Sequence, residues 1–182
     1  MRLGRVQPVV AVFERPARPS LDEVAAAARR LVVLEGVDNP TNVGAIVRNA
    51  AAFGWDGLVS DQASADPLAR RALRVAMGTA FALPHARVPD IVAALRELRA
   101  RSFRLVALTP SAAAVDLRMV EVGGPAAVLI GAERDGLSHD TLAACHVRAR
   151  IPMGGAVDSL NANAAAAAIA CYVLGPTGSA AS

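Results

Sequence analysis

The chain of 182 residues contains no lysine, only two cysteines and few aromatic residues. Its whole basic complement is arginine, and its formal net charge is +3 at pH 7. Cys145 and Cys171 form no CxxC pair and have no histidines at zinc-ligand spacing, which argues against a metal site and suits a reducing cytosol. Because an arginine bias also arises from the base composition of coding DNA, the charge leaves nucleic-acid binding open.

Long apolar runs and nucleotide-phosphate loops are also missing. The longest apolar run, residues 164–174, is shorter than the ~20 residues that span a bilayer. The amino terminus lacks the apolar core and cleavage site of a signal peptide, so we expect a cytoplasmic protein without membrane contact. No GxGxxG follows the first predicted strand and no GK[ST] ending occurs, which disfavours a dinucleotide enzyme.

The sequence does contain short β-branched runs that alternate with helical patterns. Strand-like runs cover residues 31–35, 57–60, 104–109 and 126–131, and an alternating segment, HVRARIPM, ends near Met153. Helical patterns cover residues 42–53, 67–77, 89–101 and 159–174. This alternation predicts an α/β fold with a parallel sheet.

The length and the 54% hydrophobic content predict one globular domain of ordinary size. Residues 1–30, rich in arginine and proline and including a short predicted helix at 21–29, are interpreted as an arm or linker. The domain itself is predicted over residues 31–175. Residues 176–182 are interpreted as a flexible tail.

Three polar clusters each follow a predicted strand. They are NPTNVGAIVRNAAAFGWDG at 39–57, LIGAERDGLS at 129–138 and IPMGGAVDSLNANAA at 151–165. Ligands bind at the carboxyl ends of the strands in an open parallel sheet, where these loops collect. We therefore expect the clusters to form one composite pocket, with Thr109-Pro110 closing a further strand at the same edge.

In the first cluster, Asn42 is expected to cap a helix, and Arg48 lies off the apolar stripe of that helix. Helical side chains lean toward the amino terminus, so Arg48 is expected to run back over Gly44 and Ala45, whose small size leaves room for a guanidinium. That arrangement suits a phosphate or ribose clamp. An ordinary capped helix with a solvated arginine remains the alternative.

The other two clusters combine glycines with polar side chains. Gly131 and Gly136 permit a close backbone approach to a ligand, with Glu133 between them. Ser159 is expected to cap the last helix, and Asn161 lies in its first turn. A plain glycine turn and a plain helix cap are the alternatives.

Elsewhere the sequence gives weaker signals. Arg70, Arg71 and Arg74 form a basic helix face that contacts either solvent or RNA. None of the three histidines has a nucleophile pattern such as GxSxG to partner it. Structural or surface roles are therefore expected for His85, His139 and His146.

In order and spacing, the clusters resemble the SpoU (TrmH) family of RNA 2'-O-ribose methyltransferases in the SPOUT superfamily, over residues 31–174. The matching motifs are Asn42-x-Gly44-x-x-x-Arg48, Gly131-x-Glu133-x-x-Gly136-Leu137, and Ile151-Pro152-Met153 with Ser159-Leu160-Asn161. Each motif alone is weak, but the ordered set is specific. The chain departs from the family at Ala162 and Asn163, where valine followed by serine or alanine is usual.

The resemblance implies a parallel α/β domain whose carboxyl end is tied in a deep trefoil knot. It also implies an S-adenosylmethionine cofactor, an RNA substrate, a homodimer and no metal. The implied catalytic residues are Asn42, Arg48, Ser159 and Asn161. The implied cofactor-binding residues are Leu108, Thr109, Pro110, Ile130, Gly131, Glu133, Ile151, Met153, Ser159, Leu160 and Asn161.

The implied reaction is attack of a ribose 2'-hydroxyl on the sulfonium methyl. Arg48 is expected to stabilise the developing alkoxide. The matching arginine of the family is proposed to help remove the proton, but a guanidinium pKa above ~12 favours electrostatic activation. Asn42 is expected to orient Arg48 or the ribose, and Glu133 to brace the knot.

Ribosomal RNA is the predicted substrate, because residues 2–29 resemble the linker that follows the RNA-binding domain of larger relatives. Transfer RNA is the alternative. Only about thirty residues precede the first strand, so the chain is interpreted as a separated catalytic domain or a compact member. An RNA-binding knot protein without catalysis is disfavoured by the intact motif residues.

Overall fold

The computed structural model describes residues 14, 15 and 17–152. The strands of this part are β1 (Arg30–Leu34), β2 (Gly57–Ser60), β3 (His85–Arg87), β4 (Arg104–Leu108), β5 (Val115–Asp116), β6 (Ala126–Ile130) and β7 (Val147–Arg150). Its helices are α1 (Leu21–Ala27), α2 (Pro40–Ala52), α3 (Arg70–Ala76), α4 (Ile91–Ala100) and α5 (His139–Ala144), with 3-10 turns η1 (Thr79–Phe81) and η2 (Leu117–Met119).

The seven strands form one sheet in the order β3-β2-β1-β6-β4-β7-β5, and every pairing is parallel. The predicted α/β fold with a parallel sheet is thereby confirmed. Strand β6 comes late in the sequence yet lies between β1 and β4, with Ala127 in register with both Leu31 and Leu105. This insertion makes loops from distant parts of the chain neighbours.

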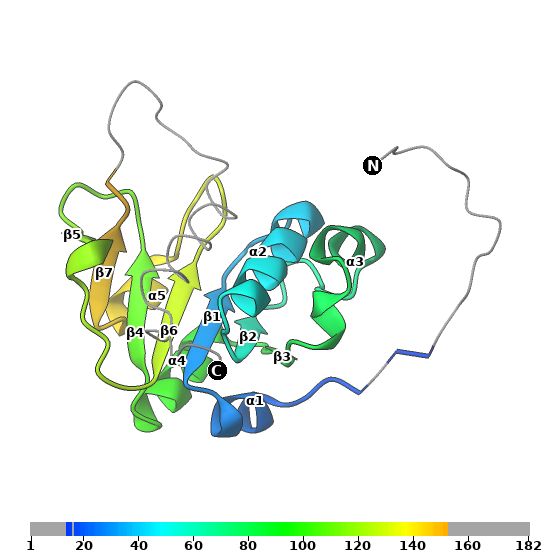
Figure 1. Ribbon diagram of the computed structural model, residues 1–182. Helices are drawn as coiled ribbons and strands as arrows, with labels where there is room; N and C mark the ends of the chain where they lie inside the picture. Colours follow the sequence, from blue (N-terminus) through cyan, green and yellow to red (C-terminus); the bar gives the residue numbers. More distant parts are fainter. Residues whose placement is uncertain (1–13, 16, 153–182) are drawn as a thin grey trace, which may run out of the picture.

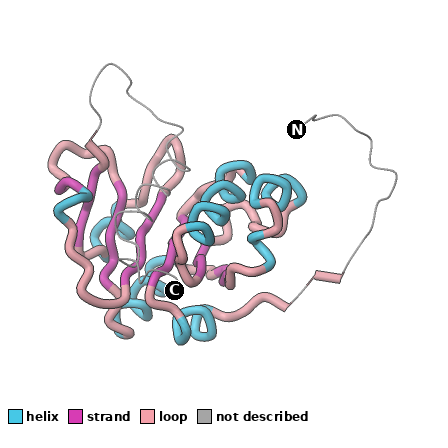
Figure 2. The backbone as a smooth tube through the Cα atoms, in the orientation of Figure 1, coloured by secondary structure: helices cyan, strands magenta, loops and turns pink. Residues whose placement is uncertain are grey.

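Helices cover both faces of the sheet (Figures 1 and 2). On one face, Val32 and Leu34 of β1 pack with residues of α2. On the other, Leu31 and Val33 pack with residues of α1 and α4. Full burial of such a side chain contributes roughly 1.5–3 kcal/mol to stability. Because successive side chains of a strand point to opposite faces, each strand stabilises the helices packed on both faces of the sheet.

The predicted strands match β1, β2, β4 and β6 to within one residue at each end. The prediction missed β3 and β5, because runs of three and two residues are too short to show an alternation. It also missed α5, which has only six residues. The predicted helix at 159–174 and the predicted trefoil knot lie outside the described residues.

The helix predicted within the amino-terminal arm is observed as α1. Ser20 caps it, since the Ser20 hydroxyl accepts a hydrogen bond from Glu23 N at 3.2 Å and the Glu23 carboxylate accepts one from Ser20 N at 2.8 Å. Val24 and Ala25 are buried in the core that α1 shares with the sheet. None of the described helices is long and apolar enough to cross a membrane.

Helices α2 and α3 touch through Gly44. A Cβ atom at Gly44 would lie 2.4 Å from the backbone oxygen of Ala72 and 2.9 Å from Cβ of Val75. Because backbone cannot move aside as a flexible side chain does, the closeness of the two helices depends on this glycine.

We expect Gly44→Ala to lower the free energy of unfolding by about 1–3 kcal/mol, because overpacking outweighs the better helix propensity of alanine. Urea unfolding followed by circular dichroism measures the change. Gly123→Ala is the matched control, since nothing lies within 4 Å of a Cβ built there. Equal stability of the Gly44 and Gly123 variants would contradict the expectation.

Candidate functional site

The predicted clusters that fall on described residues lie along one edge of the sheet. Strands β1, β6, β4 and β7 are consecutive neighbours and parallel, so their carboxyl ends share the edge marked by the arrowheads in Figure 1. A hydrogen bond of 2.9 Å from Thr109 N to Ala149 O ties the end of β4 to β7. This is the edge at which open parallel sheets bind ligands.

Helix α2 begins two residues earlier than predicted. Asn39 is its cap, with a side chain that accepts a hydrogen bond from Thr41 N at 2.9 Å, and Pro40 is the first helical residue. Proline suits that position because its fixed φ is helical and it has no N–H to leave unpaired. The expected cap at Asn42 is therefore wrong, and its side chain is available for another contact.

Asn42 joins the first cluster to the second. It is 2% exposed, and its Nδ2 donates a hydrogen bond of 2.7 Å to Oε1 of Glu133. A carboxylate accepts hydrogen bonds but donates none, so this contact fixes the rotation of the amide and aims Oδ1 elsewhere. No described residue bonds to Oδ1. The pair thus presents one oriented acceptor at the carboxyl edge.

The loop that carries Glu133 is closed tightly by its own backbone. Ala132 and Gly136 exchange two hydrogen bonds of 3.1 and 3.0 Å, and Gly136 has a φ of +68°. A Cβ at Gly131 would lie 2.2 Å from the carbonyl carbon of Gly136. Both glycines are therefore needed to form the loop itself, and the loop holds Glu133 opposite Asn42.

Arg48 is exposed on α2, and no described residue forms a hydrogen bond or ion pair with it. It lies four residues after Gly44 and hence on the side of α2 that faces α3. The space predicted above Gly44 for its guanidinium is filled by Ala72, which corrects that expectation. Arg48 and Asn42 are six residues apart, about 120° around the helix, so they face different directions.

Glu35, directly after β1, lies at the same edge and is not among the predicted site residues. Its carboxylate accepts hydrogen bonds from Ser138 N at 2.9 Å, Ser138 Oγ at 2.7 Å and Thr141 Oγ1 at 2.8 Å. These contacts fix the exit of the second cluster where α5 begins. Two features of the sequence indicate such contacts. A carboxylate follows directly after a buried strand, and a serine that can cap a helix stands three residues before a threonine.

The loop after β2 supports the loop that leads into α2. Gly36 N donates to the Asp61 carboxylate at 3.0 Å, and Val37 N donates to Ser64 Oγ at 3.0 Å. Ala65 N returns a hydrogen bond of 2.8 Å to Val37 O. The approach to α2, which carries Asn42 and Arg48, is therefore held on one side by this loop.

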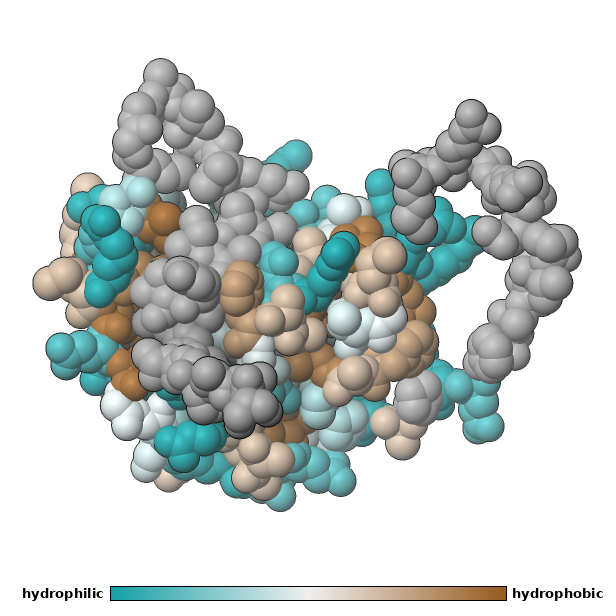
Figure 3. Space-filling view, in the orientation of Figure 1, coloured by the Kyte–Doolittle hydropathy of each residue, from teal (hydrophilic) through white to brown (hydrophobic). Residues whose placement is uncertain are grey.

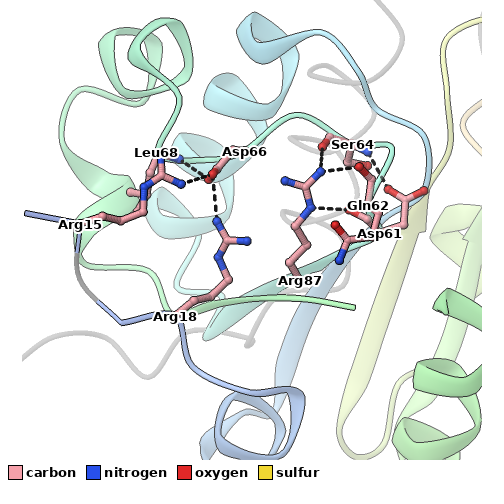
Figure 4. Close-up of polar contacts among 8 residues, drawn as sticks. All are labelled: Arg15, Arg18, Asp61, Gln62, Ser64, Asp66, Leu68 and Arg87. Atoms are coloured by element: carbon pink, nitrogen blue, oxygen red, sulfur yellow. Dashed lines mark hydrogen bonds and ion pairs between the residues drawn. The ribbon is translucent and has the colours of Figure 1, made fainter. Parts of the chain in front are cut away.

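Arg87 in turn holds the loop after β2 (Figure 4). Its Nε donates to Asp61 O at 3.1 Å, and its Nη2 donates to Ser64 O at 2.9 Å and also to Gln62 O. One guanidinium thus binds three carbonyls of a single turn, which a planar fork with five donors can do.

Asp66 anchors the end of the same loop to the segment before α1 (Figure 4). Nη2 of Arg18 forms an ion pair with Oδ2 of Asp66 at 2.9 Å, and Arg15 forms a second ion pair with the same oxygen. Burial alone would raise the pKa of Asp66, but hydrogen bonds from Leu68 N and Arg15 and the charges of Arg18 and Arg15 hold that pKa below its usual value. The contribution of this anchor to stability is present above the ordinary aspartate pKa and is lost as the pH falls through the lowered value.

Apolar side chains predicted to hold a cofactor meet at the carboxyl edge. Ile130 is buried in the core cluster under α2, and Leu108 and Ile151 are partly buried against that cluster. Gly131 and Glu133 belong to the closed loop, whereas Thr109 is half-buried and Pro110 exposed. The remaining predicted residues, Met153, Ser159, Leu160 and Asn161, lie outside the described residues.

Two titratable side chains of the described part, Cys145 and His146, are engaged in contacts with the backbone. Burial raises the pKa of Cys145 to about 12, and its thiol donates to Thr141 O, so Cys145 is no nucleophile at neutral pH. His146 accepts a hydrogen bond of 3.0 Å from Leu105 N at the opposite edge of the sheet. No group of three or more potential metal ligands occurs among residues 14, 15 and 17–152.

The described residues form a parallel α/β protein in which a hydrogen bond joins two of the predicted motifs at the carboxyl edge of the sheet. A model of the SpoU rRNA Methylase family matches residues 29–172. The chain belongs to that family.

Individual relatives agree with this assignment. The chain is 44% identical over 167 residues to an uncharacterized tRNA/rRNA methyltransferase of Mycobacterium bovis, covering 90% of this chain and 58% of the relative. It is 33% identical over 165 residues to the 23S rRNA (guanosine-2'-O-)-methyltransferase RlmB of Vibrio vulnificus, covering 90% and 65%. The chain therefore spans less than two thirds of the length of these relatives.

A solved structure is similar in fold as well. The SpoU methyltransferase AviRb from Streptomyces viridochromogenes, crystallised in complex with AdoMet, superposes with a TM-score of 0.78 at 29% identity. The superposition covers 86% of this chain and 64% of that one.

We expect Glu133→Ala to destabilise the protein by about 1–3 kcal/mol, because it leaves the buried Asn42 amide without its acceptor. Glu133→Gln keeps an acceptor oxygen at the same place and is expected to lose less than half as much. The midpoint and slope of urea unfolding measure both variants. A glutamine variant as unstable as the alanine variant would show that acceptance from Asn42 is not what Glu133 contributes.

We expect Arg87→Ala to lower the melting temperature by about 3–12 °C, since charge-assisted hydrogen bonds contribute about 1.5–3 kcal/mol and 1 kcal/mol corresponds to about 2–4 °C at this size. Arg87→Lys should recover only part of the lost melting temperature, because one ammonium group does not span three carbonyls. Differential scanning calorimetry provides the measurement, with Arg96→Ala on the exposed face of α4 as the control. Equal melting temperatures for Arg87→Ala and Arg96→Ala would refute the bracing role.

Proposed function

We propose that this chain carries the catalytic unit of an RNA methyltransferase that transfers a methyl group from S-adenosylmethionine to a ribose 2'-hydroxyl. The observation that carries the proposal is the hydrogen bond between Asn42 and Glu133. It joins the first and second family motifs at the carboxyl edge, on the same helix that presents an exposed Arg48. Family membership and the AdoMet complex of AviRb support the same reaction.

The described residues at the edge fit a cofactor of this kind. Leu108 and Ile151 are half-buried and Ile130 is buried at the ends of three neighbouring strands, an apolar setting that suits a purine. When bound, S-adenosylmethionine supplies an electrophilic methyl on a sulfonium. We assign its binding to these three residues together with Thr109, Pro110, Gly131, Glu133, Met153, Ser159, Leu160 and Asn161.

In the proposed reaction, a bond forms between the ribose O2' and the methyl carbon while the bond from that carbon to sulfur breaks. The hydroxyl proton would pass to solvent water, and the sulfur would keep the electron pair of the broken bond and become a neutral thioether. Arg48 contributes a permanent positive charge that stabilises the developing alkoxide and the adjacent phosphate. A guanidinium holds its proton too tightly to act as a base, so this role is electrostatic.

Asn42 is proposed to position the ribose. Glu133 already accepts from its Nδ2, so Oδ1 is the atom left to accept a hydrogen bond from a sugar hydroxyl. Orientation toward Arg48 is less favoured, because the two residues lie on different sides of α2. Ser159 and Asn161 are proposed to complete the catalytic set.

Ribosomal RNA is the favoured substrate, since a 33% identical relative is named as a 23S rRNA enzyme. Transfer RNA is the second candidate, because the 44% identical relative is named for both RNAs. We further propose that the carboxyl end forms the trefoil knot, that the protein acts as a cytoplasmic homodimer, and that transfer needs no metal.

We expect Arg48→Ala to reduce methyl transfer by about 10²–10³-fold, the usual loss when one transition-state donor is removed. Donor affinity should stay within about twofold, because Arg48 acts on the RNA sugar. Arg48→Lys keeps the charge and should retain more turnover than the alanine variant. Transfer of tritiated methyl to 23S rRNA and to tRNA measures the reaction, and isothermal titration measures donor binding.

Wild-type turnover by Arg48→Ala would remove Arg48 from the mechanism. A wild-type protein that binds RNA but no S-adenosylmethionine would instead favour the RNA-binding protein without catalysis. Arg96→Ala serves as the control for loss of one positive charge.

A further inference from the structure

The helices α2 and α3 carry charge of one sign only. No carboxylate occurs between Asp38 and Asp56, the stretch that contains α2, or between Asp66 and Asp90, the stretch that contains α3 and η1. The four exposed arginines on these helices are Arg48, Arg70, Arg71 and Arg74. By contrast, α1, α4 and α5 each include at least one acidic residue.

These four arginines have no polar partner among the residues that the structure describes. Across the described part of the chain, none of the four takes part in a hydrogen bond or an ion pair through its side chain. Other arginines of the fold do have such partners, as Arg87, Arg18 and Arg118 show. As far as residues 14, 15 and 17–152 are concerned, the donors of these guanidinium groups are therefore available to an external anion.

The fold packs α3, which carries three of these arginines, against α2, which carries Arg48. Both helices connect parallel neighbouring strands, so both begin at the carboxyl edge and run back along the sheet. The contact at Gly44 sets α3 directly against α2, with Arg70 and Arg71 in the first turn of α3 and Arg74 one turn further on. Figure 3 shows hydrophilic side chains at the upper end of α3 and apolar ones below them.

The apolar side chains at the far end of α3 include an exposed aromatic ring. Phe81 in η1 is 67% exposed, whereas Trp55 and Phe103 are buried and Phe53 is half-buried. Helix α2 and helix α3 both contact η1. A surface of arginines followed by an exposed aromatic ring matches the needs of single-stranded RNA, whose phosphates bind guanidinium groups and whose bases stack on aromatic faces.

We propose that the α2–α3 face, formed by Arg48, Arg70, Arg71, Arg74 and Phe81, is the track on which a single-stranded segment of the RNA substrate lies. The inference rests on the proposed function, because it places RNA beside Arg48. The three arginines of α3 bind consecutive phosphates, and Phe81 stacks with an unpaired base. A second copy of the chain is a poorer occupant, because a symmetric contact through this face sets like charges together.

The test measures RNA affinity of the full chain without any methyl donor. A fluorescein-labelled mixed-sequence 20-nucleotide RNA, single-stranded or annealed to its complement, is titrated at several salt concentrations, and anisotropy gives Kd. For Arg70→Ala/Arg71→Ala/Arg74→Ala we expect Kd for the single strand to rise ~10–100-fold near physiological salt. The slope of log K against log salt should fall by about 2, since each lost phosphate contact removes roughly 0.7.

A matched control removes the same charge from the other side of the molecule. Arg96→Ala/Arg99→Ala/Arg104→Ala changes α4 and the start of β4, and we expect a change in Kd of less than about threefold. Phe81→Ala should raise Kd for the single strand ~5–100-fold, the usual effect of one stacking residue. Its effect on duplex RNA should be small, and Phe81→Tyr should restore binding because it keeps the aromatic face.

Several results would overturn the proposal. If the triple variant of α3 keeps the wild-type affinity and salt slope, the RNA binds elsewhere. If the α3 variant and the control variant lose affinity equally, the effect is one of net charge. Loss of self-association in the α3 or Phe81 variants, seen by sedimentation, would make the face a subunit contact. Circular dichroism verifies that each variant is folded. The binding of S-adenosylmethionine is measured separately from RNA affinity. If the protein binds no S-adenosylmethionine but the RNA affinities change as expected, only the proposed function is refuted.

Discussion

The position of β6 between β1 and β4 is the constraint on which the rest of the site depends. Parallel pairing on both sides fixes its register, so the loop after Ile130 must emerge beside the loop after Leu34. From that placement follow the hydrogen bond between Asn42 and Glu133 and the carboxylate of Glu35 at the start of α5. Segments separated by about ninety residues thus become one site because a strand is inserted rather than added at an edge.

The loops at this edge are held from several directions. Arg87 binds three carbonyls after β2, and that loop supports the backbone that leads into α2. The closed turn from Gly131 to Gly136 holds Glu133 from the other side. A transition-state site needs its donors and acceptors fixed before the substrate arrives. This bracing is consistent with methyl transfer as the proposed reaction.

The same architecture accounts for how the cationic surface is built. Gly44 lets α3 approach α2 until Ala72 nearly touches the backbone, so two helices without any carboxylate lie side by side. Arg48 lies on the α3 side of α2 and therefore belongs to both the proposed reaction centre and the proposed RNA track. Binding of the RNA backbone and activation of its sugar would then be properties of one surface.

The sequence by itself determined the parallel α/β fold, four of the strands, the family and the identity of the motif residues, because local alternation and motif spacing are written along the chain. Arg48, Asn42 and Glu133 were all found in this way. Only the tertiary structure decided that Asn42 pairs with Glu133, that Ala72 fills the space over Gly44, and that Glu35 and Arg87 brace the edge. Those contacts join residues that are far apart in sequence, and their partners are chosen by strand order and helix packing, which local patterns do not encode.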